Sequence, residues 1–275
     1  MGRRVWRVFY PVLTHVGIYL VVLLAAAVIF MSQVSTEADL NSILTKYAAI
    51  LTMIALVITI PIEFLYYKRD YVLHTNYIFK NPKYLIAVII VGLLMSHGLS
   101  LLVSLINAGG ALGSYEQVEQ VIYSSDLIIV ALRTVILAPL CEELIFRGLM
   151  FRRMREDAGF LVSAIISSAI FALYHMNVPQ GIFAFLYGML LCLFYEMFGN
   201  LWVTMIVHAS GNILSLLLTY LGVGYTAIWS CVVSMVIMFA LSYIIYRFVL
   251  KKGSVGAAAE ISEMQRKVDA IKRGY

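Results

Sequence analysis

Two adjacent glutamates, Glu142 and Glu143, lie inside an apolar stretch of the chain, in the run Ala138-Pro-Leu-Cys-Glu-Glu-Leu-Ile-Phe-Arg147. An unpaired charge at a bilayer centre costs roughly 3 to more than 10 kcal/mol, so carboxylates in such a stretch are candidates for chemistry. Glu143 and Arg147 are four residues apart with the acid first, the favourable order for an ion pair within a helix. Glu142 lies about 100° around the helix and lacks that partner. The alternative is that both glutamates only anchor neighbouring helices.

Two further pairs of residues have the same four-residue spacing, Phe171 with His175 and His208 with Asn212. Each pair shares one face of a helix, so the Phe171 ring can fix the His175 imidazole and His208 and Asn212 can aim two donors at one point. Depths counted at 1.5 Å per residue are roughly 8 to 15 Å for Glu142, 12 Å for His208, 18 Å for Asn212 and 21 to 24 Å for His175. We expect these groups to meet near mid-membrane, with His175 fitting least well. His15 and His97 are interpreted as helix-packing hydrogen bonders.

Pro139 lies three residues before Glu142. It cannot donate a hydrogen bond to the carbonyl of Val135, so a kink is expected there. The kink would open room beside Glu142.

The composition predicts an all-α, polytopic membrane protein. Of the residues, 62% are hydrophobic and 13% are charged, and the mean hydropathy is +0.92, whereas a soluble domain carries about 25% charged residues. Windows of about 20 residues, the length that crosses the hydrocarbon core, indicate eight transmembrane helices. They are Val12 to Met31, Tyr47 to Tyr67, Tyr84 to Ile106, Leu127 to Met150, Phe160 to Met176, Ile182 to Phe198, Leu201 to Leu221 and Ala227 to Leu250.

The distribution of lysine and arginine predicts the orientation. With the N-terminus inside, 18 of the 20 basic residues lie on the cytoplasmic side, and both termini are cytoplasmic. We expect one transmembrane domain over residues 1–252, with its catalytic core at 127–221, and a cytoplasmic amphipathic tail at 253–275. The net charge of +5 then reflects orientation and attraction to anionic lipid, with no nucleic-acid partner expected. The three cysteines fall within spans, which disfavours a disulfide framework.

The three motifs, Glu142-Glu143-x-x-x-Arg147, Phe171-x-x-x-His175 and His208-x-x-x-Asn212, resemble in order and helix placement the signatures of the CPBP or Abi family. This family comprises CAAX prenyl endopeptidases and bacteriocin-processing or immunity proteins. The resemblance covers about Leu127 to Leu221. It implies an intramembrane glutamic endopeptidase in the cell membrane, in which Glu142 and His175 activate water while His208 and Asn212 form an oxyanion hole. Glu143, Arg147 and Phe171 would support them.

Residue chemistry agrees with this assignment, since peptide hydrolysis needs a base for water and donors for the oxyanion. No cofactor is expected, although Glu142, His175 and His208 could also form a three-ligand zinc site. Other readings are a catalytically silent membrane scaffold, a bacteriocin self-immunity protein, and a transporter that uses Glu63, Arg133 and Glu143. The expected partner is a membrane-associated peptide or protein substrate, with prenylated tails, pheromone precursors and leader peptides all left open. The oligomeric state is left open too. The basic cytoplasmic loops favour a site reached from the cytoplasmic leaflet.

Overall fold

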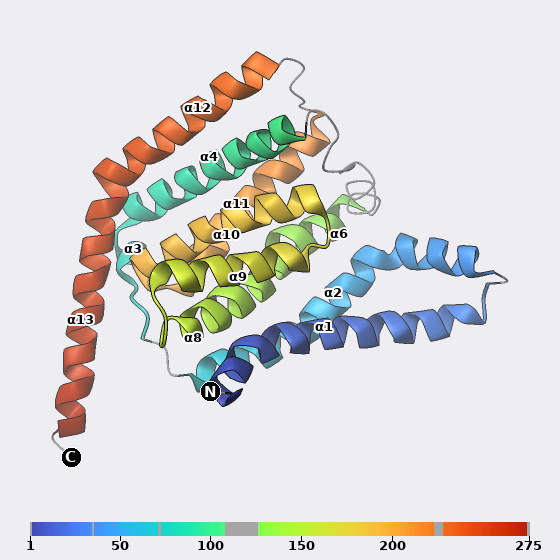
Figure 1. Cartoon of the computed structure of the whole chain (residues 1–275), viewed down its shortest axis with the longest axis horizontal. Coiled ribbons are helices and arrows are strands. Elements are labelled where there is room, and N and C mark those ends of the chain that lie inside the picture. The colour runs from blue at the N-terminus through green and yellow to red at the C-terminus, as the bar shows by residue number, and fades with distance from the viewer. Residues whose placement is uncertain (1, 35, 71–72, 108–125, 223–227, 274–275) are drawn as a thin grey trace.

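The computed structural model describes residues 2–34, 36–70, 73–107, 126–222 and 228–273. These residues form helices with short connections and no strand among them, and Figure 1 shows the long helices stacked side by side. In chain order the elements are α1 (Gly2–Met31), α2 (Glu37–Arg69), α3 (Tyr77–Lys80), α4 (Pro82–Ile106), α6 (Leu127–Ala131), η1 (Leu132–Leu137), α7 (Ala138–Glu143), η2 (Leu144–Phe151), α8 (Arg152–Met154), α9 (Phe160–Tyr174), α10 (Val178–Phe198), α11 (Leu201–Tyr220), α12 (Ile228–Ile245), η3 (Tyr246–Leu250) and α13 (Lys251–Arg273).

Six of the described helices are long and apolar enough to cross a membrane. They lie within the ranges Arg4–Met31, Glu37–Arg69, Pro82–Ile106, Val178–Phe198, Leu201–Tyr220 and Ile228–Asp269. The chain is therefore an all-α, multi-pass membrane protein, as the composition predicts. A count of eight also requires the run from α6 to α8 and helix α9 to cross. Because the 15 residues of α9 extend only about 22 Å, the count of eight and the cytoplasmic termini stay predictions.

The run from α6 to α8 is one continuous helical stretch that contains two π-helical segments. Pro139, where a kink is predicted, lies between them. A π-helical segment, η1, precedes the proline, and the Ala138 N–H donates to the Arg133 carbonyl five residues earlier. This wider turn lies immediately before the residue whose nitrogen cannot donate. A second π-helical segment, η2, carries Arg147. Such segments are rare and often lie at functional sites.

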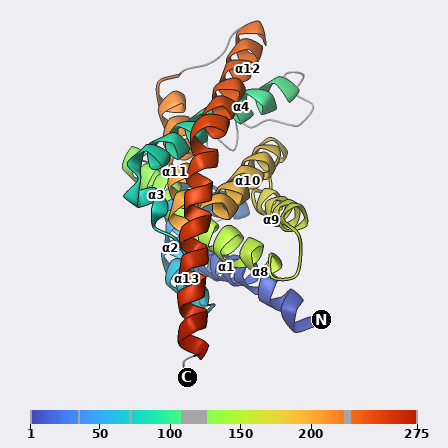
Figure 2. The ribbon, with the colours of Figure 1, turned by 90° about the vertical axis from the view of Figure 1, so that its left-hand side faces the viewer.

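The predicted tail is helical and continues from α12 through η3 into α13 without a break. Figures 1 and 2 show α13 running across one end of the stacked helices, beside α3. The first half of α13 packs against this end of the helices, and Ala257 is fully buried. Gly199 ends α10 with a φ of +54°, and Ile261 lies so close that a Cβ at Gly199 would clash with its Cδ1.

An ion-pair cluster joins α1 and α2 to the basic end of the run from α6 to α8. Asp70 accepts hydrogen bonds from Arg152 and from Arg153, whose Nε lies 2.7 Å from the carboxylate. Arg153 also donates to the Tyr10 hydroxyl over 2.9 Å. This cluster holds the hairpin of α1 and α2 against the helix that carries the two glutamates.

The topology prediction can be tested with cysteines introduced at Ser32, which follows α1, and at Ser262 on α13. Seven crossings lie between these positions if all eight predicted helices span, so the two cysteines should react from opposite sides. An impermeant maleimide applied to intact and to opened cells measures this. The native cysteines Cys141, Cys192 and Cys231 are buried and provide the low background. Labelling from the same side would contradict the eight-helix topology.

Candidate active site

Glu143 is fully buried and bridges two helices. Its Oε1 accepts a hydrogen bond from Arg147 Nη1 over 2.9 Å, as the four-residue spacing predicts. The same oxygen lies 2.8 Å from Nδ1 of His208 on α11. Neither Glu143 nor Arg147 has any exposed side-chain surface. The spacing gives no information about the second contact, because it joins segments 65 residues apart.

Arg147 extends this bridge to α9. Its guanidinium carbon lies 4.5 Å from the centroid of the Phe171 ring, a cation–π arrangement. Gly188 on α10 makes room for the arginine, because a Cβ there would lie 2.9 Å from Arg147 Nη2. Phe171 also contacts His175, with ring centroids 4.7 Å apart and the planes at 83°. The predicted aromatic support of His175 is therefore present.

His175 lies at the C-terminal end of α9, where its Nδ1 is 2.8 Å from the Phe171 carbonyl oxygen. A carbonyl oxygen only accepts, so Nδ1 carries the proton and Nε2 of the neutral ring is the acceptor. The helix stops here because Met176 adopts a left-handed φ of 51°. Asn177 then caps the N-terminus of α10, and its side chain accepts from the Gln180 N–H over 3.0 Å.

Glu142 lies beside His208 on the cavity side of Glu143. Its Oε2 is 3.7 Å from His208 Nε2, and the residue is 8% exposed. Because the ionised Glu143 only accepts, His208 donates through Nδ1 and turns Nε2 toward Glu142. His208 can then donate from Nε2 only as an imidazolium.

Asn212 lies one turn beyond His208 on α11. Its Nδ2 donates to the backbone carbonyl of Thr134 over 2.7 Å. That carbonyl lies in η1, so the amide is oriented by the irregular part of the neighbouring helix. One of the two amide protons is used in this bond, and the other is left to serve a ligand.

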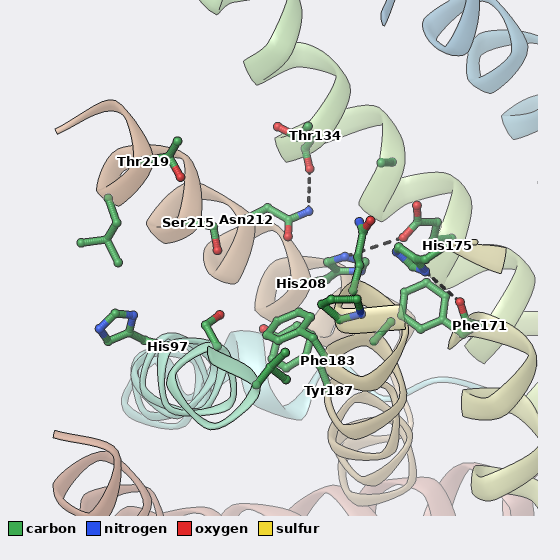
Figure 3. Close-up of a pocket in the computed structure, with 18 of the residues that line it drawn as sticks. His97, Thr134, Phe171, His175, Phe183, Tyr187, His208, Asn212, Ser215 and Thr219 are labelled. Atoms are coloured by element: carbon green, nitrogen blue, oxygen red, sulfur yellow. Dashed lines mark hydrogen bonds and ion pairs between the residues drawn. The ribbon is translucent and has the colours of Figure 1, made fainter. Parts of the chain in front are cut away.

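A cavity of about 630 Å³ is lined by all four predicted catalytic residues, Glu142, His175, His208 and Asn212. Figure 3 shows His208, His175 and Phe171 gathered near one end, with Asn212, Ser215 and Thr219 following α11 toward the other. The lining also includes Asn107 and Thr219, at the ends of α4 and α11. The cavity thus extends away from the helix ends that carry Arg152 and Arg153. If the N-terminus is cytoplasmic as predicted, the cavity extends toward the opposite side of the membrane. The approach from the cytoplasmic leaflet stays a prediction.

Several cavity residues are not identified by the motifs. Tyr174 and Tyr187 contribute aromatic walls, and His97 and Arg133 contribute polar groups. The Tyr187 hydroxyl donates to the Val207 carbonyl over 2.9 Å, which fixes its ring beside His208. Tyr174 is the one with a sequence signal, since it precedes the histidine of the second motif. The others depend on how the helices pack.

The arrangement has the parts that hydrolysis of an acyl group requires. Glu142 and the acceptor nitrogen of His175 can take protons from water, while His208 and Asn212 can donate to a negative oxygen. Ser210, between the two donors, is bonded to the Ile206 carbonyl over 2.7 Å. In the described part of the chain, no three His, Cys, Asp or Glu side chains are grouped as metal ligands. The zinc alternative still requires a direct test.

Comparisons with known proteins confirm the resemblance to the CPBP family. Residues 124–214, about a third of the chain, match the family model described as type II CAAX prenyl endopeptidase Rce1-like. A Bacillus subtilis (strain 168) protein named "Putative membrane peptidase YdiL" is 29% identical over 77 residues, which are 28% of this chain and 32% of that protein. The chain thus matches about a third of the length of this relative. No solved structure matches the chain. At the level of the family, these findings support a membrane peptidase, which is a hydrolase.

Replacing Glu143 by Gln should strongly lower thermal stability. The change leaves the buried Arg147 charge without its partner, and breaking a buried pair in this way costs about 3 to 5 kcal/mol. Glu196→Gln is the matched control, because it breaks the partly exposed ion pair with Arg155, which is worth about 1 kcal/mol or less. Thermal unfolding in detergent measures both. An equal shift in the two variants would show that Glu143 does not carry the bridge.

Proposed function

We propose that this protein is an intramembrane glutamic endopeptidase that hydrolyses a peptide bond of a membrane-associated peptide or protein. The observation that carries the proposal is the convergence of Glu142, His175, His208 and Asn212 on one cavity between apolar helices. The family resemblance supports the same reaction class. A cavity of this volume is within the usual range for ligand sites, about 300 to 1,000 Å³.

Water activation is assigned to Glu142 with His175. His175 accepts a hydrogen bond from the water through Nε2, because its Nδ1 is bonded to the Phe171 carbonyl. Glu142 takes the proton that is lost as the water oxygen attacks the scissile carbonyl carbon. When the tetrahedral intermediate collapses, the C–N bond breaks and the protonated Glu142 returns that proton to the leaving amine.

Stabilisation of the oxyanion is assigned to His208 and Asn212. His208 donates from Nε2 as an imidazolium, with its Nδ1–H directed to Glu143. Asn212 donates the amide proton that Thr134 does not use. These donors are oriented before substrate arrives, so little reorganisation is needed when charge develops. Glu143, Arg147 and Phe171 hold the water-activating pair and the two oxyanion donors in fixed relative positions.

The decisive variant is Glu142→Gln, which should lose cleavage activity by about 10² to 10⁴-fold, because an amide cannot act as a base. The assay uses the purified full chain in detergent micelles with a fluorogenic peptide library, and the best-cleaved peptide serves as substrate. The thermal midpoint should change little, because Glu142 is outside the Glu143–Arg147 pair.

Wild-type turnover by the Glu142→Gln protein would remove this residue from the mechanism. A chelator control separates the zinc alternative. Activity should persist after dialysis against EDTA and 1,10-phenanthroline, and a loss that zinc restores would make the enzyme a metalloprotease.

Asn212→Ala tests the oxyanion role. We expect kcat to fall by about 10² to 10³-fold with KM nearly unchanged, because the interaction is made in the transition state. Ser210→Ala is the matched control on the same helix, and its kcat should stay near that of the wild type. A raised KM with kcat preserved in Asn212→Ala would make this residue part of the substrate-binding wall instead.

A further inference from the structure

A buried histidine on the first helix is linked to the cavity wall. His15 is 4% exposed, and both ring nitrogens have partners. Nδ1 lies 3.0 Å from the Thr59 hydroxyl on α2, and Nε2 lies 2.8 Å from the Tyr174 hydroxyl on α9. The Sγ of Cys141, the residue before Glu142, lies 3.9 Å from Nδ1. His15 thus lies where α1, α2, α7 and α9 meet.

The direction of each hydrogen bond between Thr59, His15 and Tyr174 follows from the bond that Thr59 makes to the backbone. Thr59 donates its hydroxyl proton to the Ala55 carbonyl over 2.8 Å, and a carbonyl only accepts. The Thr59 oxygen must therefore accept from His15 Nδ1–H. The Nε2 of the neutral ring then accepts the hydroxyl proton of Tyr174. His15, Thr59 and Tyr174 thus have mutually consistent hydrogen bonds, and the Tyr174 hydroxyl points to α1 rather than into the cavity.

Tyr174 is next to His175, so its position affects a candidate catalytic group. The two rings are 5.6 Å apart at 87°, and both residues line the cavity. Helix α9 ends at Tyr174, and Met176 with its φ of 51° turns the chain away, so no further helical turn supports His175. A left-handed conformation at a residue with a side chain costs about 1 to 3 kcal/mol and persists only where its surroundings hold it. Side-chain anchors therefore have to hold this end of α9.

We propose that His15 is a positioning residue of the active site, which acts through Tyr174 to hold the end of α9 and the His175 ring. The first helix thereby completes the site, although His15 lies outside the stretch of residues 124–214 that matches the family model. The catalytic part of this inference rests on the proposed endopeptidase function. The linkage of His15 to Tyr174 does not.

The test compares His15→Ala, Tyr174→Phe and the double variant with a matched control, Tyr10→Phe. The control removes another hydroxyl contact of α1, the one to Arg153, which lies away from His175. We expect His15→Ala and Tyr174→Phe each to lower kcat by about 10 to 10²-fold, as small misplacements of catalytic groups do, with KM within about twofold. The double variant should lose no more than the greater single loss, because the two residues act as one unit.

His15→Gln should recover much of the activity, since an amide supplies one acceptor and one donor. Tyr10→Phe should lower the thermal midpoint but leave kcat unchanged. Each kcat is calculated per folded molecule, so that a loss of stability alone does not lower it. An unchanged kcat in His15→Ala, or multiplied losses in the double variant, would overturn the positioning role.

Hydrogen exchange measured by mass spectrometry gives a readout that needs no substrate. Amides from Phe171 to Asn177 should exchange faster in His15→Ala and Tyr174→Phe than in the wild type and in Tyr10→Phe. Equal exchange in all four proteins would overturn the linkage, even if His15→Ala proves too unstable for kinetics. If the wild type cleaves no peptide, the proposed function fails, whereas the exchange result still decides whether His15 holds the end of α9.

Discussion

The site depends on one buried carboxylate, that of Glu143. A charge with no exposed surface is tolerable only when it is paired and hydrogen-bonded. The Oε1 of Glu143 is bonded to Arg147 on its own helix and to His208 on α11. Arg147 in turn lies over Phe171, which supports His175. One ion thereby fixes the relative positions of three helices. The preceding residue, Glu142, lies about 100° around the helix and faces the cavity.

The sequence predicts the local relations well. Glu143 with Arg147 and Phe171 with His175 are each four residues apart, and helical geometry alone places each pair on one face. The all-α membrane architecture follows from composition for a similar reason, since about 20 apolar residues cross a bilayer. Contacts between different helices cannot be predicted from spacing or composition. The bonds of Glu143 to His208 and of Asn212 to the Thr134 carbonyl depend on helix packing and on the π-helical turns.

His15 is another residue whose contacts cannot be predicted from sequence spacing. A lone histidine in an apolar helix is most simply interpreted as a packing hydrogen bonder, and its two bonds agree with that interpretation. Its relevance to the site arises only because α9 ends early and Tyr174 lies beside His175 in the folded chain. The cavity likewise extends toward the helix ends opposite Arg152 and Arg153, a direction that loop charges do not encode. The site thus combines short motifs with contacts from α1, α2, α4 and α10.

The most direct measurement of the central claim is a comparison of the membrane peptidomes of cells that carry the wild-type protein or its Glu142→Ala variant. Intramembrane proteolysis by this site predicts that specific membrane-associated precursors accumulate uncut in the variant, while their cleavage products disappear. The accumulated precursors would also identify the substrate. Identical peptidomes, with both proteins present at equal levels in the membrane, would contradict the assignment of Glu142 as the base of a peptidase.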